Sequence, residues 1–395
     1  MATAPVVDTD MFGPEAIINA RAIDDGLREL APAVKLSRED ITILGRYEHV
    51  KEGLADWRTF SSTSRPWHDP NSPRPEILLT DDPPRHTEVR SVVARAMSKR
   101  AMDRWATRFR GDAARIVDSL LDRSGEVIDA TADISRPFVY KALPDVIGLP
   151  EQGREHMEAF GHMVWATLGP PNDLFAEAMA DVETLGAWIE GATQREHLAR
   201  DSLGMAMFDA ADDGAITHKD ALLLVQTIVA ASADTTVMTL SAAIRAFCEF
   251  PDQWQVLRAD RGLVRNAFDE SLRWDSPSRM AGRITTTDVD IDGITIPADE
   301  RVGLLFAAAN RDPRKWHEPD RFDVKRDLTG QLGWGFGVHV CVGRQLALLE
   351  ADALLSELLE RVERWEPAGP PEPWMTAIGH GPAALPVRLF AASEH

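Results

Sequence analysis

The sequence predicts a mainly α-helical fold with small β-sheets. Helical patterns dominate from about residue 84 to residue 275, and one stretch, 217–250, is apolar on nearly all sides. Strand patterns are few and short by comparison. No internal repeat or low-complexity linker divides the chain, so we expect one domain over residues 1–395, with residues 1–34 as an N-terminal arm.

The stretch 217–250 predicts a single long helix. Thr217 and Asp220 have the spacing of a capping box, which starts a helix, and Pro251 stops it. At ~1.5 Å per residue this helix is ~45 Å long, well above the ~10–14 residues of an average globular helix. Because it is apolar nearly all round, we expect it to run through the middle of the molecule.

Asp292-Gly293 gives the strongest strand signal, since this dipeptide between alternating residues is typical of a tight hairpin. The hairpin pairs residues 289–291 with residues 294–296. Pro386 indicates an edge position for a late strand at 385–389, because proline cannot donate a ladder hydrogen bond. Two more strands are expected, at 41–44 and, beside the hairpin, at 302–306.

The composition narrows the class of protein. Acidic residues outnumber basic ones by 63 to 43, giving a net charge of -20, so neither nucleic acid nor a membrane surface is an expected partner. Two cysteines, Cys248 and Cys341, exclude a disulfide scaffold and any four-cysteine metal site. The chain starts without a secretory signal, and no segment offers about 18 uninterrupted apolar residues for a membrane span. These features predict a soluble cytoplasmic protein.

The most informative segment is residues 333–343, which reads GWGFGVHVCVG. Its glycines permit positive φ and let the backbone approach a flat object closely. A helix pattern begins directly after Cys341, and a cysteine at a helix N-terminus is favoured as thiolate, which is a metal ligand. Zinc is disfavoured because Cys341 has no partner cysteines. A buried core cysteine is the alternative interpretation, and it suits Cys248 on the long helix.

Residues 333–343 resemble the haem-binding signature of the cytochrome P450 family, F-G-x-G-x-H-x-C-x-G, with Trp334 in place of the phenylalanine. The resemblance implies the cytochrome P450 fold, with the long helix 217–250 as an oxygen-binding helix over haem b and residues 333–343 as the haem-ligand loop. Cys341 would ligate the iron, and a thiolate ligand favours O–O cleavage. The loop glycines carried over as cofactor-binding are Gly335, Gly337 and Gly343.

Other segments follow the family's order. Glu270 and Arg273 match its E-x-x-R pair, and Arg321 in Pro-Asp-Arg-Phe matches the arginine that joins the pair in a buried ion network. The segment 82–90 resembles the family's haem-contacting helix start. The resemblance assigns four side chains to the haem propionates, namely His86, Arg90, Arg283 and His339.

The long helix carries Ala-Ser-Ala-Asp-Thr-Thr at 231–236, similar to the family's A-G-x-D-T-T. Asp234 would bring protons from solvent, and Thr235 would hold a hydrogen bond beside the oxygen site. Ser232 replaces the glycine, and its hydroxyl can bond back to the Ile228 carbonyl.

The segments 169–173, 266–270 and 309–313 resemble bacterial members that oxidise para-substituted benzoates. Those members use a basic residue where Gln226 stands, so this pocket is expected to be wider or less charged. Arg65 or Arg279 could restore a clamp for a carboxylate. The predicted pocket residues are Trp165, Leu168, Gln226, Thr227, Ala230, Arg279, Met280 and Ala281.

The resemblance implies a monooxygenase that hydroxylates or O-demethylates a small aromatic acid or methoxyphenol. Electrons would come ultimately from NAD(P)H through a ferredoxin and its reductase, because the chain contains no flavin or ferredoxin module. A basic docking patch for ferredoxin is expected at Arg90, Arg95, Lys99, Arg100, Arg104, Arg108, Arg110 and Arg344, the alternative being a solvated helix face. Alternative functions are oxidation of another small apolar substrate such as a terpenoid, a peroxide-driven reaction, and a non-catalytic haem protein.

Overall fold

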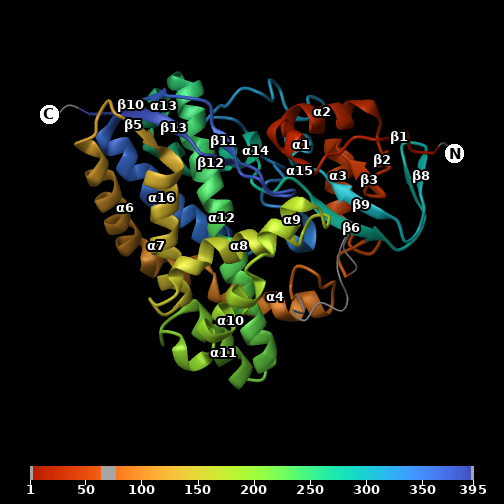
Figure 1. The fold of residues 1–395 in the computed structure, drawn as a ribbon, viewed down its shortest axis with the longest axis horizontal. Coiled ribbons are helices and arrows are strands. Elements are labelled where there is room, and N and C mark those ends of the chain that lie inside the picture. The colour runs from red at the N-terminus through yellow and green to blue at the C-terminus, as the bar shows by residue number, and fades with distance from the viewer. Residues whose placement is uncertain (1–2, 64–76, 393–395) are drawn as a thin grey trace.

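A long helix, α12 (His218–Glu249), runs through the middle of the molecule in the computed structural model, which describes residues 3–63 and 77–392 (Figure 1). The predicted capping box starts it: the Thr217 hydroxyl accepts from the backbone of Asp220 (3.1 Å), and the Asp220 carboxylate accepts from the backbone of Thr217 (2.9 Å). Pro251 opens the next helix, α13 (Pro251–Ala259), and so ends α12. The prediction of one central helix is confirmed.

Length and composition alone would let α12 cross a membrane, but 61% of its most apolar window is buried inside the protein. Helices α7, α8, α11 and α14 pack against it, so its apolar surface faces other helices, as expected for a core helix. The helices besides α12 and α13 are α1 (Pro14–Ile18), α2 (Ala20–Leu30), α3 (Tyr47–Ala55), α4 (Arg85–Ala96), α5 (Lys99–Met102), α6 (Ala106–Leu121), α7 (Arg136–Ile147), α8 (Met157–Ala166), α9 (Asp173–Ala178), α10 (Val182–Ala192), α11 (Leu203–Asp212), α14 (Val264–Trp274), α15 (Phe306–Ala309) and α16 (Arg344–Arg361).

Short strands form sheets beside this helical body (Figure 1). The largest has the order β1 (Val6–Val7), β2 (Val34–Leu36), β3 (Ile41–Leu44), β9 (Arg301–Leu304), β6 (Ala281–Thr285), β4 (Phe60–Ser61). A second runs β10 (Val362–Pro367), β13 (Pro386–Ala391), β5 (Val127–Asp129), and two pairs are β7 (Val289–Ile291) with β8 (Ile294–Ile296) and β11 (Glu372–Pro373) with β12 (Pro382–Ala384). The mainly α fold with small sheets is therefore as predicted.

Two strand predictions were wrong in their partners. The strand predicted at 302–306 is β9, and it lies between β3 and β6 instead of beside the β7–β8 hairpin. The strand predicted at the edge, β13, lies in the centre of its sheet, between β10 and β5. Pro386 is tolerated there because it is the first residue of the strand.

The described part of the predicted N-terminal arm, residues 3–34, contributes β1, α1 and α2 and packs into a hydrophobic cluster around the six-stranded sheet. A second, larger cluster fills the helical body. Trp334 belongs to the helical cluster, whereas Phe336 packs against the sheet cluster. The predicted ligand loop therefore lies at the border of the two clusters.

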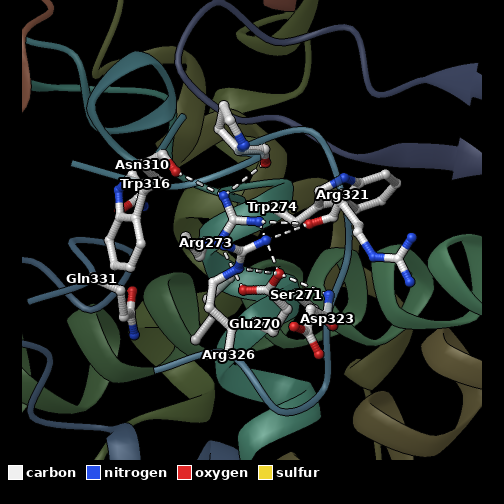
Figure 2. Close-up of polar contacts among 12 residues, drawn as sticks. Glu270, Ser271, Arg273, Trp274, Asn310, Trp316, Arg321, Asp323, Arg326 and Gln331 are labelled. Atoms are coloured by element: carbon white, nitrogen blue, oxygen red, sulfur yellow. Dashed lines mark hydrogen bonds and ion pairs between the residues drawn. The ribbon is translucent and has the colours of Figure 1, made fainter. Parts of the chain in front are cut away.

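Glu270 and Arg273, on α14, form a fully buried ion pair (Figure 2). Arg273 donates to both carboxylate oxygens of Glu270, at 2.7 and 2.8 Å, and also to the carbonyl oxygen of Asn310 at 2.9 Å. The side chain of Asn310 in turn accepts from the backbone N–H of Leu332 at 2.8 Å, just before the ligand loop. The buried pair thus positions the segment that leads into the loop.

Arg326, and not Arg321, supplies the third member of this network. Its Nε lies 3.0 Å from Glu270, whereas the Arg321 guanidinium points away and pairs with Asp252 at 3.1 Å, half exposed (Figure 2). Arg321 contributes only its carbonyl oxygen, which accepts from Arg273 and Arg326. The prediction for the Arg321 side chain was wrong because the turn after it brings a later arginine back to Glu270.

We therefore predict that Arg326→Ala lowers the free energy of unfolding by about 3 kcal/mol or more, because it leaves part of a buried carboxylate uncompensated. Arg321→Ala should cost less than ~1 kcal/mol, since it breaks an exposed pair. Denaturant unfolding of the two variants measures the difference. Equal losses would show that the assignment of Arg326 is wrong.

Candidate functional site

The loop around Cys341 has a backbone that only glycine adopts easily. Gly335 and Gly337 have φ of +72° and +67°, in the left-handed region. The N–H of Cys341 donates to the carbonyl oxygen of Trp334 at 2.7 Å, which closes the loop before α16 begins at Arg344. Cys341 therefore stands next to the N-terminus of a long helix, as predicted.

Neighbouring helices enclose the loop closely. A Cβ on Gly337 would clash with the carbonyl oxygen of Leu54 in α3, and one on Gly333 would lie 2.9 Å from the carbonyl oxygen of Leu272 in α14. Gly343 differs, because its φ is −78° and a Cβ there would meet nothing closer than 3.8 Å. Two of the loop glycines are thus required by close approach, and Gly343 is not.

Cys341 is a free cysteine with an exposed side chain. Desolvation by the surrounding protein raises the pKa of its thiol, while backbone N–H groups of Gly343 and Arg344 and the Arg90 guanidinium lower it. Cys341 is therefore accessible to solvent and is also surrounded by protein that desolvates its thiol. Ala231 is likewise exposed although it lies halfway along α12, and Thr235, one turn later, is half-buried on the same side of the helix.

The four side chains assigned to the propionates are held near the loop without carboxylate partners. His86 and His339 have ring centroids 4.4 Å apart, and the His339 ring bonds to the Ser62 hydroxyl at 3.0 Å. Arg90 donates to the carbonyl oxygen of Val340, and buried Arg283 donates to that of Gly282. Neither arginine has an ion pair with any residue in the described ranges.

These residues fit a haem with two propionates. Neither ring nitrogen of buried His86 has a hydrogen-bond partner among residues 3–63 and 77–392, which is costly unless a ligand supplies one. Burial lowers the pKa of Arg283 to about 10, and an anion beside it would relieve that cost. Burial, with Arg283, His86 and Arg90 nearby, lowers the pKa of His339 to about 3, so this ring is a neutral donor. Cys341, the exposed thiol among them, is the residue that would hold the iron.

Asp234 on α12 is 5% exposed and receives a hydrogen bond of 2.8 Å from the Tyr140 hydroxyl. Its other carboxylate oxygen is buried and has no hydrogen-bond partner in the described part of the chain, and the Asp234 side chain borders a cavity of about 510 Å³ together with Arg136, Glu158, His162 and Trp374. Burial raises the pKa of Asp234 to about 7, against the lowering effect of the Tyr140 bond. The carboxyl group can therefore exchange a proton near neutral pH.

Hydroxyl groups follow the middle of α12 and bond back to their own helix. The predicted bond of Ser232 to the Ile228 carbonyl is present at 2.7 Å. Thr235 donates to the carbonyl of Ala231 at 3.1 Å, and Thr236 to that of Ser232 at 3.2 Å. The helix stays continuous from His218 to Glu249, so Ser232 is accommodated without breaking it.

Four of the predicted pocket residues, Trp165, Leu168, Met280 and Ala281, meet in the hydrophobic cluster around the sheet. Trp165 packs edge-on against Trp374, with ring centroids 5.7 Å apart. On α12, Ala230 is buried, the Thr227 hydroxyl bonds to the Leu223 carbonyl, and the Gln226 amide donates to Thr193 at 3.3 Å.

The prediction that Arg279 contacts substrate was wrong. Its guanidinium is 1% exposed, pairs with Asp24 at 2.5 Å and donates to the carbonyl oxygen of Met11 at 2.6 Å. Arg279 therefore fastens the N-terminal segment and is not free to bind a carboxylate. Arg65, the alternative clamp, lies outside the described residues.

Half of the predicted basic patch is paired with acidic residues. Asp103, Asp145, Asp352 and Asp269 pair with Lys99, Arg108, Arg110 and Arg344 respectively. Arg104 donates to the carbonyl of Asp201 and lies over Trp105. Only the exposed side chains of Arg95 and Arg100 have neither a hydrogen bond nor an ion pair with a residue in the described part of the chain.

Two polar residues near α12 escaped the sequence analysis. Tyr140, on α7, holds Asp234, and Glu350, on α16, is 1% exposed with one oxygen unpartnered and a pKa raised by burial to about 8. In the sequence, Glu350 looked like an ordinary charged residue on the surface of a helix. Tyr140 belonged to no motif in the sequence, although the chain has only two tyrosines.

Comparisons with known proteins show the family of this chain. The sequence model described as Cytochrome P450 matches residues 191–381. A cytochrome P450 from Rhodopseudomonas palustris, CYP199A2, is 35% identical over 401 residues, covering 99% of this chain and 96% of its own length. Nocardicin C N-oxygenase from Nocardia uniformis subsp. tsuyamanensis is 32% identical, covering 91% and 93%. The structure of cytochrome P450 CYP109Q5 from Chondromyces apiculatus gives a TM-score of 0.82 at 28% identity, covering 98% and 99% of the two chains.

The fold and the cysteine site thus define a haem-thiolate oxidoreductase. This chain belongs to the cytochrome P450 family. It is a monooxygenase that uses haem b, O2 and electrons derived from NAD(P)H.

The glycine geometry leads to a prediction about haem binding. Gly337→Ala should lower the free energy of unfolding by about 3 kcal/mol and reduce haem retention, because Ala strains a positive φ and meets the Leu54 carbonyl. Gly343→Ala, the matched control, should change stability by less than ~1 kcal/mol. Denaturant unfolding of the apoprotein and the haem content after purification are the measurements. Two variants with the same stability would contradict the close approach.

Proposed function

We propose that this monooxygenase inserts one oxygen atom into a small aromatic substrate, with electrons from a ferredoxin and its reductase, in the cytoplasm. Three segments that resemble benzoate-oxidising members support an aromatic substrate, as does the apolar cluster holding Trp165 and Met280. The observation that carries the proposal furthest is the Asp24–Arg279 pair, which removes a candidate carboxylate clamp. A methoxyphenol or another neutral aromatic is therefore a candidate substrate beside an aromatic acid, whose other candidate clamp, Arg65, lies outside the described residues.

Haem b bound through Cys341 supplies the oxygen-activating chemistry, since a thiolate ligand favours O–O cleavage. The protein must deliver protons, because the second oxygen atom of O2 leaves as water. We assign this role to Asp234 because its side chain borders the 510 Å³ cavity and its pKa is close to neutral pH. Tyr140 holds the other oxygen and so fixes the carboxyl group. Thr235, the next residue along α12, would pass the proton to the oxygen site.

Ferredoxin would dock at the exposed surface of α4 and α5, through Arg95 on α4 and Arg100 on α5. These two guanidinium groups have no ion pair in the described part of the chain. Arg90, on the same helix as Arg95, donates to the carbonyl oxygen of Val340, the residue before Cys341. We expect charge reversal at Arg95 and Arg100 to weaken the salt dependence of reduction by an acidic ferredoxin. Unchanged rates and salt dependence would exclude this face.

The substrate proposal is tested by titrating the haem protein with matched aromatic ligands and recording the spin-state shift. A para-methoxybenzoate and its methyl ester differ in the carboxylate charge. Without a clamp, we expect the ester or a methoxyphenol to bind at least as tightly as the acid. An acid that binds about tenfold tighter, a difference of about 1.4 kcal/mol, would show that another residue recognises the carboxylate.

The proton role of Asp234 predicts a change in rate and in pH dependence. Asp234→Asn should slow turnover about 100-fold while substrate still shifts the spin state, because the Asn side chain carries no transferable acid proton. A protonated Asp234 is needed, so turnover should fall as pH rises through about 7. The Tyr140 bond lowers the pKa of Asp234, so Tyr140→Phe should move this fall to higher pH.

Tyr47→Phe is the matched control for this pH profile. Its hydroxyl also donates a buried hydrogen bond, to the carbonyl of Gly330 at 2.8 Å, but not to Asp234. The control should keep the wild-type profile. A Tyr140→Phe profile that matches Tyr47→Phe would refute the assignment.

A further inference from the structure

Both ends of the cysteine loop contact one carboxylate, that of Asp269 on α14. The indole Nε1 of Trp334, before Cys341, donates to one oxygen at 2.5 Å. The guanidinium of Arg344, after Cys341, donates to the other oxygen at 3.3 Å. Arg344 also lies over the Trp334 ring, with 5.6 Å to its centroid. Asp269, Trp334 and Arg344 thus form a closed triangle, here called the Asp269 clamp.

The clamp adds to the backbone bond that closes the loop. Cys341 already donates its N–H to the carbonyl of Trp334, so fixing Trp334 also fixes the backbone of Cys341. Asp269 neighbours Glu270, whose buried network fixes α14 against the segment leading into the loop. α14 therefore holds the loop twice, through two successive carboxylates.

The contact depends on tryptophan at position 334. Phenylalanine, which the family signature has there, could fill the same space against Phe268, whose ring centroid is 6.1 Å away, but it has no N–H to donate. Trp334 is 8% exposed, and burial raises the pKa of Asp269 while Trp334 and Arg344 lower it. A half-buried carboxylate that loses either partner keeps its desolvation cost without the compensating bond.

We infer that Asp269 is a positioning residue: through Trp334 and Arg344 it holds Cys341 in the geometry that ligates iron, and so protects the thiolate bond. This inference rests on Cys341 as the ligand and goes beyond it by assigning residues that support the ligand. Such supporting contacts orient a ligand and limit the loop motion by which it would leave the metal.

The experiment follows the Soret band that marks thiolate-ligated haem in the ferrous carbon monoxide complex. The half-life of this band in mild denaturant is compared for the wild type, Trp334→Phe, Asp269→Ala and Asp269→Asn. Trp334→Phe and Asp269→Ala should shorten the half-life about fivefold or more, because each breaks the clamp. Asp269→Asn should fall between Asp269→Ala and the wild type, since its carbonyl oxygen can still accept from the indole.

A double variant and a control separate positioning from general stability. Trp334→Phe added to Asp269→Ala should shorten the half-life no further, since both act through one carboxylate. Asp252→Ala breaks another acid–arginine pair, with Arg321, away from the loop, and should keep the wild-type half-life. The unfolding midpoint of the helices by circular dichroism should stay near the wild-type value in Trp334→Phe, which a merely structural role would not allow.

A wild-type half-life in Trp334→Phe would overturn the inference, as would equal shortening in Trp334→Phe and Asp252→Ala. If Asp269→Ala does not fold, Trp334→Phe decides alone. A wild-type protein that binds haem without the thiolate band would refute Cys341 as ligand, and the clamp would fall with it. A shortened half-life beside unchanged aromatic binding would support the clamp whatever the substrate proves to be.

Discussion

Glu270 is the charge on which the architecture of the site depends. Its fully buried carboxylate is compensated by Arg273, by Arg326 and by the backbone N–H of Asp323. A buried charge is tolerable only when all its partners are in place. The segment 310–326 must therefore pack against α14 whenever the protein is folded. The side chain of Asn310 also accepts a hydrogen bond from the backbone of Leu332, and so fixes the start of the ligand loop.

This order places the Cys341 loop at the border of two hydrophobic clusters. Glycines permit the close approach of the loop to α3 and α14. Asp234 on α12 and Glu350 on α16 are buried carboxyl groups, and burial raises the pKa of each towards neutral pH.

The features that could be predicted from the sequence are those determined by residues close together in the chain. The capping box of Thr217, the Asp292-Gly293 hairpin and the glycine spacing around Cys341 each depend on a few neighbouring residues, and the structure contains them as expected. Long-range pairings were not predictable in this way. Arg279 meets Asp24, 255 positions away, and Arg326 instead of Arg321 turns back to Glu270. The tyrosine that holds Asp234 gave no pattern of its own, because one hydroxyl on an apolar helix has no periodic signal.

The place of β13 in the middle of its sheet has a consequence for how the chain can be altered. β10 and β5 lie far apart in sequence and touch only through this late segment. Shortening the chain before Pro386 would leave both neighbours with bare backbone edges, which invite pairing with other molecules. The C-terminal segment therefore supplies the central strand that joins this sheet. Fusions or tags should be attached after Ala391.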